Sequence, residues 1–600
     1  MSRRGLPAWL LPGAGLLWAL SPLFSARPAG LNARGLGELP VLNEGRLKPL
    51  DTVARASLLE LSGRQEVEGP EGSLDADQWL LTVLSRPAQA DGLAIFTVDD
   101  PGLLSMAGLS EGSKRRFSFK ELRGALGPIE RQAQAADSLD PARRTRFQSA
   151  ALNLAARLNL YVRLKNSLWP EDQASMASAL SRLARQAQDP KSAAGVVELL
   201  RQLVSSPAVF RPVMTGSCLP SGFIDAGSAA MRAASGAGPS ESLLAWARLR
   251  DAAADDDAAS FDAALSDYER GARKACPDQV SWARREALFN RFEPFYRGLG
   301  LYLVSLLALL AGWLLKREDL ERAALRLAVL AFAVHSGGLI FRTVLQGRPP
   351  VTNLYSSAVF VGWVAVGAGL LLERRYKSGL ATLGADVIGF STLIIAHHLA
   401  TQGDTVEMMR AVLDSNFWLS THVVTITMGY GAGLLATALA DVALLKMAWR
   451  RGAADAAAID MIYALLCACL VLSFVGTVLG GIWADHSWGR FWGWDPKENG
   501  ALLIVLWNAI ALHARWGGYI RQKGLVVMAI LGGVVISLAW FGVNMLGIGL
   551  HSYGFTDSAF HGLLAFIGAQ AALLVAAFAK IWRDEKQGRL PSRGRLQPGS

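Results

Sequence analysis

The sequence is short of charge. Only 18% of its 600 residues are Asp, Glu, Lys or Arg, whereas 52% are hydrophobic. A soluble enzyme of this length carries about a quarter charged residues, so the balance argues against one and favours membrane insertion. The net charge is +10, but the basic residues are not gathered in one soluble stretch, which excludes a nucleic acid as partner.

Cysteine is scarce too, and no CxxC motif supports a thiol pair that exchanges with a substrate. Cys218 and Cys276 lie in the polar first half, where they either form a disulfide or stay free. Cys467 and Cys469 lie inside an apolar run and are interpreted as packing residues.

Long apolar runs are absent from residues 27–297, a region that is Ala-rich, polar and interrupted by Pro and Gly. Crossing about 30 Å of hydrocarbon takes about 20 apolar residues. Runs of this kind are predicted at 298–315, 323–341, 354–372, 380–399, 423–445, 461–480, 500–514, 525–545 and 562–580. We therefore predict an all-α fold, a polytopic transmembrane bundle of about nine spans, preceded by a mainly α-helical domain.

Basic residues mark alternate loops between these runs, and such loops face the cytoplasm. The basic loops contain Lys316, Arg317 and Arg322; Arg374, Arg375 and Lys377; Lys446, Arg450 and Arg451; Arg515, Arg521 and Lys523; and the tail from Lys580 to Arg595. The opposite loops contain few basic residues. This alternation predicts a multi-pass protein of a bacterial inner membrane whose first half lies on the extracytoplasmic side.

The N-terminus supplies an export signal. Arg3 and Arg4 precede an apolar run from Leu6 to Phe24, which is typical of a signal peptide or an uncleaved anchor. The predicted domains are 1–26, signal or anchor; 27–297, extracytoplasmic helical domain; 298–582, transmembrane domain; and 583–600, basic cytoplasmic tail.

Two histidines and a tryptophan-rich segment are predicted at the outer membrane boundary. His422 opens one span, and His551 lies in a later outer loop. Between them comes GIWADHSWGRFWGWDPKENG, with Trp483, Trp488, Trp492 and Trp494 interleaved with Arg490, Asp495, Pro496, Lys497 and Glu498. An ordinary interfacial loop is one interpretation of this aromatic density, because Trp anchors membrane helices.

Haem b is the other interpretation. Its flat face stacks on aromatic rings, its propionates need Arg or Lys, and its iron takes axial imidazoles. His513 follows Asp495 by 18 residues, a rise of about 27 Å along a helix, and is either a ligand of a second, inner haem site or a core histidine.

The tract WGRFWGWDPKE, with FWLSTH and GVNMLGIGLHSYGF beside it, resembles the tryptophan-rich haem-handling proteins of cytochrome c biogenesis, in the CcsA/ResC branch. The resemblance covers roughly residues 298–582. GRPPVTNLYSS and ALHARW agree with it, and LPVLNEGRLKPLDTVAR resembles a segment of some long members. Position 500 is Gly where the family often has Trp, and Ser356 stands where an acidic residue is common.

The resemblance implies roles for the site residues. His422 and His551 are the outer axial ligands of haem held against the tryptophan-rich segment, and His513 is the inner ligand. A CcsB/ResB-type membrane protein usually supplies the second inner histidine. Inside this chain the candidate for that ligand is His335, which is otherwise a packing residue. His486 is either a spare ligand or a residue at the rim.

The implied function is cytochrome c maturation of the System II type. Haem crosses the membrane and is attached to the CxxCH motif of an apocytochrome c, which makes the chain a cytochrome c haem lyase, alone or only with its partner. A haem carrier or exporter without ligase activity and a cytochrome b are the alternatives. Histidine pairs 13 or 14 residues apart are typical of cytochromes b and are absent here. A transporter is disfavoured because no repeat is evident.

Overall fold

A computed structural model gives the fold. It describes residues 9–24, 30–70, 72–109, 115–140, 143–170, 175–186, 207–400, 404–406, 409, 413–449, 455–543 and 557–587. The chain divides into two compact units. The bundle unit comprises Met1–Leu23, Glu293–Leu399 and Met409–Ser600, and the N-terminal unit comprises Phe24–Phe292 and Ala400–Met408. A short segment from between two bundle helices thus folds with the N-terminal unit.

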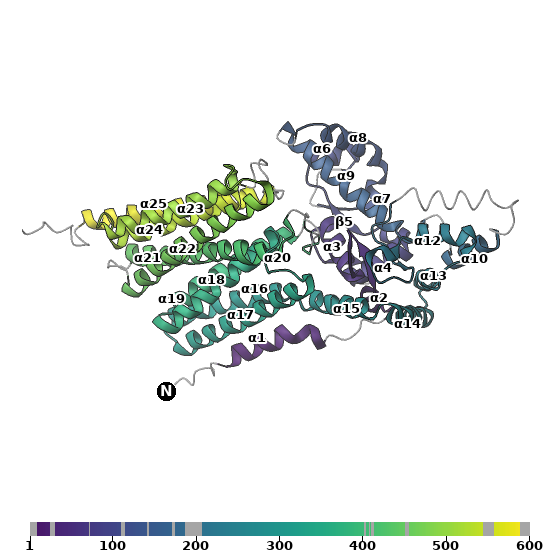
Figure 1. The fold of residues 1–600 in the computed structure, drawn as a ribbon, viewed down its shortest axis with the longest axis horizontal. Coiled ribbons are helices and arrows are strands. Elements are labelled where there is room, and N and C mark those ends of the chain that lie inside the picture. The colour runs from purple at the N-terminus through teal and green to yellow at the C-terminus, as the bar shows by residue number, and fades with distance from the viewer. Residues whose placement is uncertain are drawn as a thin grey trace, which may run out of the picture. The chain divides into compact units, whose positions relative to one another are not determined.

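Long helices make up the bundle unit, where they run side by side (Figure 1). They are α16 (Pro294–Leu315), α17 (Glu318–Gln346), α18 (Leu354–Tyr376), α19 (Leu380–Leu399), α21 (Val424–Trp449), α22 (Ala456–Trp488), α23 (Pro496–Trp516), α24 (Gln522–Trp540) and α25 (Asp557–Lys586), with the short α20 (Asn416–Trp418) and the π-helix η9 (Leu419–Val423) before α21. Seven of the nine expected apolar runs lie within a helix of this set, whereas 423–445 begins in η9 and continues in α21, and 525–545 extends beyond the end of α24.

Eight helical stretches of the described residues are long and apolar enough to cross a membrane, which confirms a polytopic helical fold. The remaining predicted span, 500–514, lies in α23 and is not among the eight. This helix has 21 residues, about 31 Å in length, but Lys497, Glu498 and Arg515 lie near its ends. Its length suits a span, whereas its polar ends reduce its apolar character.

Small residues bring the bundle helices close together, as is common in membrane proteins. A Cβ atom on Gly369 of α18 would lie 2.7 Å from the Cβ of Ala385 on α19. A Cβ on Gly389 of α19 would lie 2.7 Å from Cγ2 of Val366 on α18. These glycines are therefore required by the approach of two backbones.

The N-terminal apolar run forms α1 (Leu10–Leu20) and the 3-10 helix η1 (Ser21–Phe24). Helix α1 packs on α17 and α16 within the bundle unit. The carbonyl of Trp18 accepts a hydrogen bond of 2.7 Å from Nη1 of Arg297, and the Arg297 guanidinium lies 5.0 Å from the Trp18 ring. The run therefore packs as part of the bundle.

Helices also dominate the N-terminal unit, as predicted. They are α2 (Ala33–Gly37), α3 (Leu50–Ser62), α4 (Ala76–Ser85), α5 (Pro87–Ala90), α6 (Pro101–Met106), α7 (Phe119–Leu122), α8 (Leu126–Asp137), α9 (Arg146–Lys165), α10 (Met176–Gln186), α12 (Ala226–Arg232), α13 (Glu241–Ala254), α14 (Ala258–Ala275) and α15 (Pro277–Phe292). Their core includes the buried rings of Trp79, Tyr161, Trp169 and Trp246.

Four two-stranded antiparallel sheets, which sequence analysis missed, lie among the described helices of this unit. The pairs are β1 (Pro40–Asn43) with β2 (Arg46–Pro49), β3 (Glu66–Gly69) with β4 (Gly72–Asp75), β5 (Ala94–Thr97) with β6 (Arg116–Ser118), and β7 (Val213–Met214) with β8 (Phe223–Ile224). Strands of two to four residues are too short for a clear alternating pattern.

Cys218 and Cys276 form a disulfide in the N-terminal unit, with a Cα–Cα distance of 5.4 Å. The bond links the segment between β7 and β8 to the residue that follows α14. Of the two sequence alternatives for this pair, the structure has the disulfide.

Candidate functional site

The tryptophan-rich segment turns between α22 and α23. Helix α22 ends at Trp488, and Gly489 adopts a left-handed conformation with φ of 68°, which suits glycine at a helix C-terminus. Asp495 is the N-cap of α23, and Pro496 occupies its first turn. The expected loop is therefore a tight connection of a few residues between two long helices.

Two carboxylates hold this connection in place. Glu498 Oε2 accepts hydrogen bonds from the backbone N–H of Gly493 at 2.8 Å and of Asp495 at 3.1 Å. The Asp495 side chain, which is buried, accepts from Lys497 N at 2.9 Å. Reciprocal capping of this kind satisfies N–H groups that a helix start leaves without partners. Asp495 and Glu498 thus shape the loop.

A cavity opens beside the connection, within the bundle unit, and encloses about 1230 Å³ including space open to solvent. Its described lining is largely apolar and aromatic, which is typical of sites for flat organic ligands. The lining comes from the segment before α18 and its first turn (Val351, Asn353, Ser357), from η9 and α21 (His422, Thr427, Tyr430), from α22 (Trp483, Trp488), from the connection and α23 (Phe491, Trp492, Lys497, Glu498) and from α24 (Trp540).

His422 is the histidine of this lining. It lies in the π-helix η9, an irregularity that is frequent at functional sites. Its Nδ1 is 2.7 Å from the carbonyl oxygen of Gly476 on α22, and because a carbonyl only accepts, Nδ1 donates. Nε2 then has the lone pair, which is the arrangement that a metal-binding imidazole needs. The Trp483 ring lies 5.8 Å from the His422 ring.

Three of the four tryptophans predicted for the site line the cavity, namely Trp483, Trp488 and Trp492. Trp494 does not, since its side chain is 70% exposed and its ring stands edge-on to Trp492 at 6.0 Å. Positive φ at Trp494, 58°, turns the chain at this point. The segment therefore presents most of its aromatic surface to one side.

Lys497 is the cation of the described lining. Its Nζ donates to the carbonyl oxygen of Trp540 at 2.9 Å, and an ammonium group has two further N–H donors. Arg490, the other predicted propionate ligand, is exposed and does not line the cavity. Its guanidinium covers Gly493, where an added Cβ would lie 2.3 Å from Arg490 Cζ.

The other predicted histidines that the structure describes lie outside the cavity lining. His335 is fully buried, with Nδ1 at 3.2 Å from the Tyr302 hydroxyl and Nε2 at 3.1 Å from the Val359 carbonyl oxygen. His513 is exposed on α23 and donates from Nδ1 to Ala509 O at 2.8 Å. His486 is exposed at the end of α22, edge-on to Trp418 at 5.8 Å. His551 lies outside the described residues.

Several cavity residues were not expected from the sequence. Tyr430 and Trp540 come from apolar helices, and Met409 and Leu413 come from the segment before α20. Trp540 donates from Nε1 to Ser357 Oγ at 3.0 Å, which joins α24 to α18 at the cavity. A tryptophan inside an apolar helix and the motif GRPPVTNLYSS were the available signals, but neither indicates which helices meet.

The two departures from the family pattern have structural explanations. Ser356 is buried at the third position of α18, and it and Asn353 form a reciprocal cap, the task that an acidic residue performs elsewhere. Gly500 packs against α24, where an added Cβ would lie 3.0 Å from Cα and Cβ of Ala539. A tryptophan at position 500 has no space in this packing.

Comparisons with known proteins identify relatives of this chain. Residues 351–551 match the model of the cytochrome c assembly protein family. The cytochrome c biogenesis protein CcsA of Parasynechococcus marenigrum is 31% identical over 298 residues, 43% of this chain and 95% of that protein. The CcsA of Synechococcus sp. strain CC9605 is 30% identical over 298 residues, with 43% and 95% coverage.

A relative that also covers the N-terminal unit is the protein NrfI of Wolinella succinogenes, 27% identical over 549 residues. The match takes in 88% of this chain but only 55% of NrfI, so the chain spans about half the length of that relative. Together with the helical bundle, these matches confirm the expected multi-pass membrane protein of cytochrome c maturation. The chain belongs to the CcsA family of cytochrome c biogenesis proteins.

Proposed function

We propose that the bundle unit carries reduced haem b across the bacterial inner membrane and holds it in the tryptophan-lined cavity for covalent attachment to an apocytochrome c. The observation that carries this proposal is the meeting of His422 with Trp483, Trp488 and Trp492 in one cavity. An imidazole and several indole faces are the groups that haem iron and a porphyrin plane require.

The cavity residues have distinct tasks in this proposal. His422 ligates the iron through Nε2, because the bond from Nδ1 to Gly476 O fixes the ring. Lys497 pairs with a propionate through the N–H groups that Trp540 O does not use. His551, assigned by resemblance alone, is the second axial ligand.

The attachment step needs little from the protein beyond position. Each thiol of the CxxCH motif adds across a vinyl group of haem, so that sulfur bonds to one vinyl carbon and a proton to the other. No oxidant is consumed, and the CxxCH histidine replaces one of the chain's axial ligands. The haem supplies the reactive groups, and the chain supplies orientation. This step makes the chain a cytochrome c haem lyase.

An inner haem site at His513 is the proposed point of entry. Leu503, Leu506, Ile510 and His513 follow one another at helical spacing, and all four are exposed on α23. An imidazole on an apolar membrane face is unfavourable unless it is covered. A CcsB/ResB-type partner that packs on this face and contributes the second histidine accounts for its exposure.

The distribution of basic residues among the loops supports an orientation with the cavity and the N-terminal unit on the extracytoplasmic side. The first helix is retained as an anchor in this proposal. Its support is the packing of α1 on α16 and α17 and the bond from Arg297 to Trp18 O, which a cleaved signal peptide has no reason to form.

The test uses a host that lacks its own c-type maturation system. The full chain is expressed with a CxxCH reporter, with and without a ResB-type partner, and purified for a haem spectrum. We expect bound haem and a covalently haemylated reporter. His422→Ala should remove most of the haem, whereas the matched control His486→Ala, outside the cavity lining, should retain it.

Three results have separate meanings. A wild-type chain without haem contradicts the proposal. Haem that persists in His422→Ala contradicts the site. Haem without reporter haemylation, even with the partner, leaves a haem carrier or exporter instead of a lyase.

A further inference from the structure

The sequence motif LPVLNEGRLKPLDTVAR forms a hairpin that presents two cations on one face. Strands β1 and β2 pair with Asn43 opposite Arg46 and Val41 opposite Lys48. Glu44 and Gly45 both have positive φ, 50° and 79°, which is the conformation of a tight two-residue hairpin turn. Arg46 and Lys48 are two residues apart on one strand, so their side chains point the same way.

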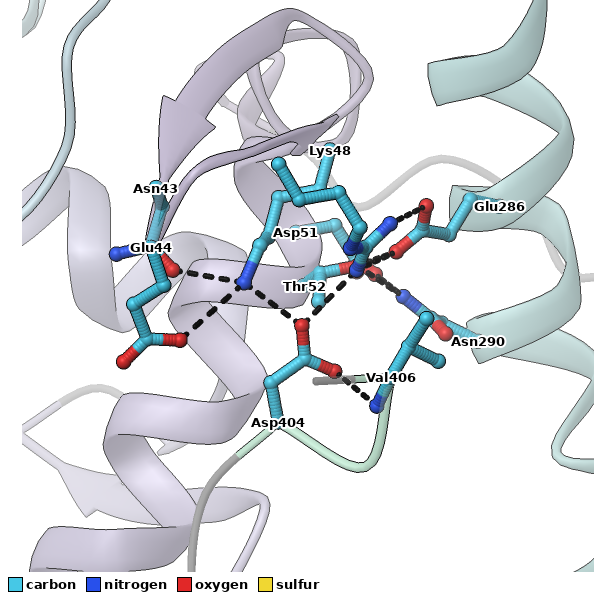
Figure 2. Close-up of polar contacts among 10 residues, drawn as sticks. Asn43, Glu44, Lys48, Asp51, Thr52, Glu286, Asn290, Asp404 and Val406 are labelled. Atoms are coloured by element: carbon cyan, nitrogen blue, oxygen red, sulfur yellow. Dashed lines mark hydrogen bonds and ion pairs between the residues drawn. The ribbon is translucent and has the colours of Figure 1, made fainter. Parts of the chain in front are cut away.

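Both cations bind one carboxylate, that of Asp404. Lys48 Nζ lies 2.7 Å and Arg46 Nη2 lies 2.9 Å from Asp404 Oδ2. Asp404 Oδ1 accepts from Val406 N at 2.9 Å. Figure 2 shows the carboxylate pointing at Lys48, with Glu286 and Asn290 of α15 on the other side of the cluster. The side chains of Lys48 and Asp404 are only 2% and 8% exposed.

The rest of the cluster neutralises Arg46 but not Lys48. Glu286 forms two hydrogen bonds with the Arg46 guanidinium, at 2.7 and 2.9 Å, and accepts a third from Thr52 Oγ1. Lys48 has, apart from Asp404, the neutral Asn43 Oδ1 at 2.8 Å and the exposed Glu44 at 3.6 Å. Asp404 is therefore the buried counter-charge of Lys48, and a buried charge that loses its partner is strongly unfavourable.

The electrostatics of Asp404 agree with this assignment. Burial alone would raise the pKa of its carboxyl, but Lys48 and Arg46 outweigh burial and hold that pKa well below its ordinary value. The carboxyl is thus bound in its charged form across the ordinary pH range.

Asp404 lies far from the hairpin in sequence. It belongs to the segment between α19 and α20, and the first part of this segment, Ala400–Met408, is in the N-terminal unit. Met409, five residues later, and Leu413 line the haem cavity of the bundle unit. Five residues span at most about 17 Å. A short piece of chain therefore joins the Asp404 cluster to the cavity wall.

The far end of the same segment is held differently. Arg348 Nη2 lies 2.6 Å from Asp414 Oδ2, and Asn416 Nδ2 donates to Gly347 O at 3.2 Å, all within the bundle unit. Asp414 is 38% exposed, so this ion pair is weaker than that of Asp404. Met409 and Leu413 thus lie between two attachment points of unequal strength.

We propose that Asp404 is a positioning residue for the haem cavity: Arg46 and Lys48 bind its carboxylate and so restrain the chain that leads to Met409 and Leu413 in the cavity wall. The proposal rests on the proposed haem function of the cavity. It gives the motif around Arg46 and Lys48 a task inside this chain, that of a binding site for Asp404.

The experiment uses the full chain with the CxxCH reporter. Asp404→Asn and Lys48→Gln should each lower bound haem per protein and reporter haemylation several-fold, and should shift the haem absorbance. Because both variants break one interaction, the double variant should be no worse than either alone. Asp262→Asn, an exposed Asp of α14, is the control and should match the wild type.

Asp404→Glu separates positioning from folding. It keeps the charge and lengthens the side chain by one methylene, so the chain should accumulate normally with an altered haem spectrum. The inference is overturned if Asp404→Asn and Lys48→Gln bind as much haem per protein as the wild type. It is also overturned if the haem losses of the two single variants multiply in the double variant. If His422→Ala loses haem while Asp404→Asn does not, only this inference fails; a wild-type chain without haem overturns the proposed function itself.

Discussion

The Asp404 cluster and the tryptophan-lined cavity use polar side chains in opposite ways. In the cluster, Arg46 and Lys48 each have a buried carboxylate as partner. In the cavity, His422 and Lys497 bond to backbone carbonyl oxygens. Buried ion pairs serve architecture, whereas an imidazole or ammonium group that a carbonyl oxygen orients is typical of ligand-binding sites. The contrast distinguishes a structural cluster from the proposed binding site.

Removal of the disulfide should have the largest effect, and only on the N-terminal unit. Cys218→Ser opens a bond that spans 58 residues, which should lower the free energy of unfolding of that unit by about 4 kcal/mol. Pulse proteolysis of the full chain in urea measures the loss. Cys467→Ser, in α22, is the control. An equal loss in both variants would show that the two units do not unfold separately.

Asp404→Asn should weaken the attachment of its segment by about 3 kcal/mol at neutral pH. The pKa of Asp404 is lower in the folded protein than its ordinary value of 3.8, so its contribution is present above that value and is lost as the pH falls further. Hydrogen exchange of the Val406 amide, corrected for its intrinsic rate, should differ between wild type and variant at pH 5 to 7 and converge in strong acid. A difference that is lost already near pH 6 would implicate another group.

Gly500→Trp should perturb the bundle and leave the Asp404 cluster intact. The new side chain has no space against Ala539, and overpacking of this kind lowers the free energy of unfolding by roughly 1 to 3 kcal/mol. Thermal unfolding of the purified chain should show a lower midpoint, with Gly568→Ala as a control, since nothing lies within 4 Å of a Cβ at position 568. A stable Gly500→Trp chain would mean that α23 and α24 can separate.

Trp483→Ala and Trp494→Ala compare a lining tryptophan with an exposed one. Loss of the Trp483 ring should reduce haem affinity roughly tenfold, about 1.4 kcal/mol, because a stacked face is lost beside His422. Trp494→Ala should change affinity little, since its side chain is 70% exposed. Haem titration of the purified variants measures both. Equal losses of haem affinity in the two variants would indicate that haem binds on the outer side of the loop.

Asp414→Asn should have the smallest effect. Its ion pair with Arg348 is partly exposed and should contribute less than about 1 kcal/mol. Hydrogen exchange at Asn416, whose side chain bonds to Gly347 O, reports on this end of the segment. A loss as large as that of Asp404→Asn would remove the distinction between the two attachment points.

Much of the fold could be predicted because an apolar run long enough to cross a membrane can be recognised from its own residues, without knowledge of what it packs against. The helices of the bundle, their order and the aromatic connection between α22 and α23 follow from local patterns. So does the turn at Asp495 and Pro496, since an N-cap followed by proline is a local signal. The short strands were missed because four residues carry too little pattern.

The candidate site could be predicted only in part. The tryptophans could be predicted because they belong to one sequence motif, and His422 because its imidazole can bind a metal. Tyr430 and Trp540 line the cavity because of how the helices pack, which no local pattern encodes. The pair of Lys48 and Asp404 spans 356 residues, so nothing in either sequence neighbourhood reveals it. Arg490 and Trp494 were predicted to join the site, but neither lines the cavity, and the positive φ of Trp494 could not be read from the sequence.

The place of Asp404 in the chain also gives biosynthesis an order. The N-terminal unit is synthesised first, through Phe292, but the counter-charge of its buried lysine is encoded about 110 residues later, after α16 to α19. At 5–20 residues per second the ribosome needs roughly 5 to 20 s to reach it. During that interval Lys48 lacks its buried partner, so the N-terminal unit reaches its final stability only in chains whose helices α16 to α19 have already been made.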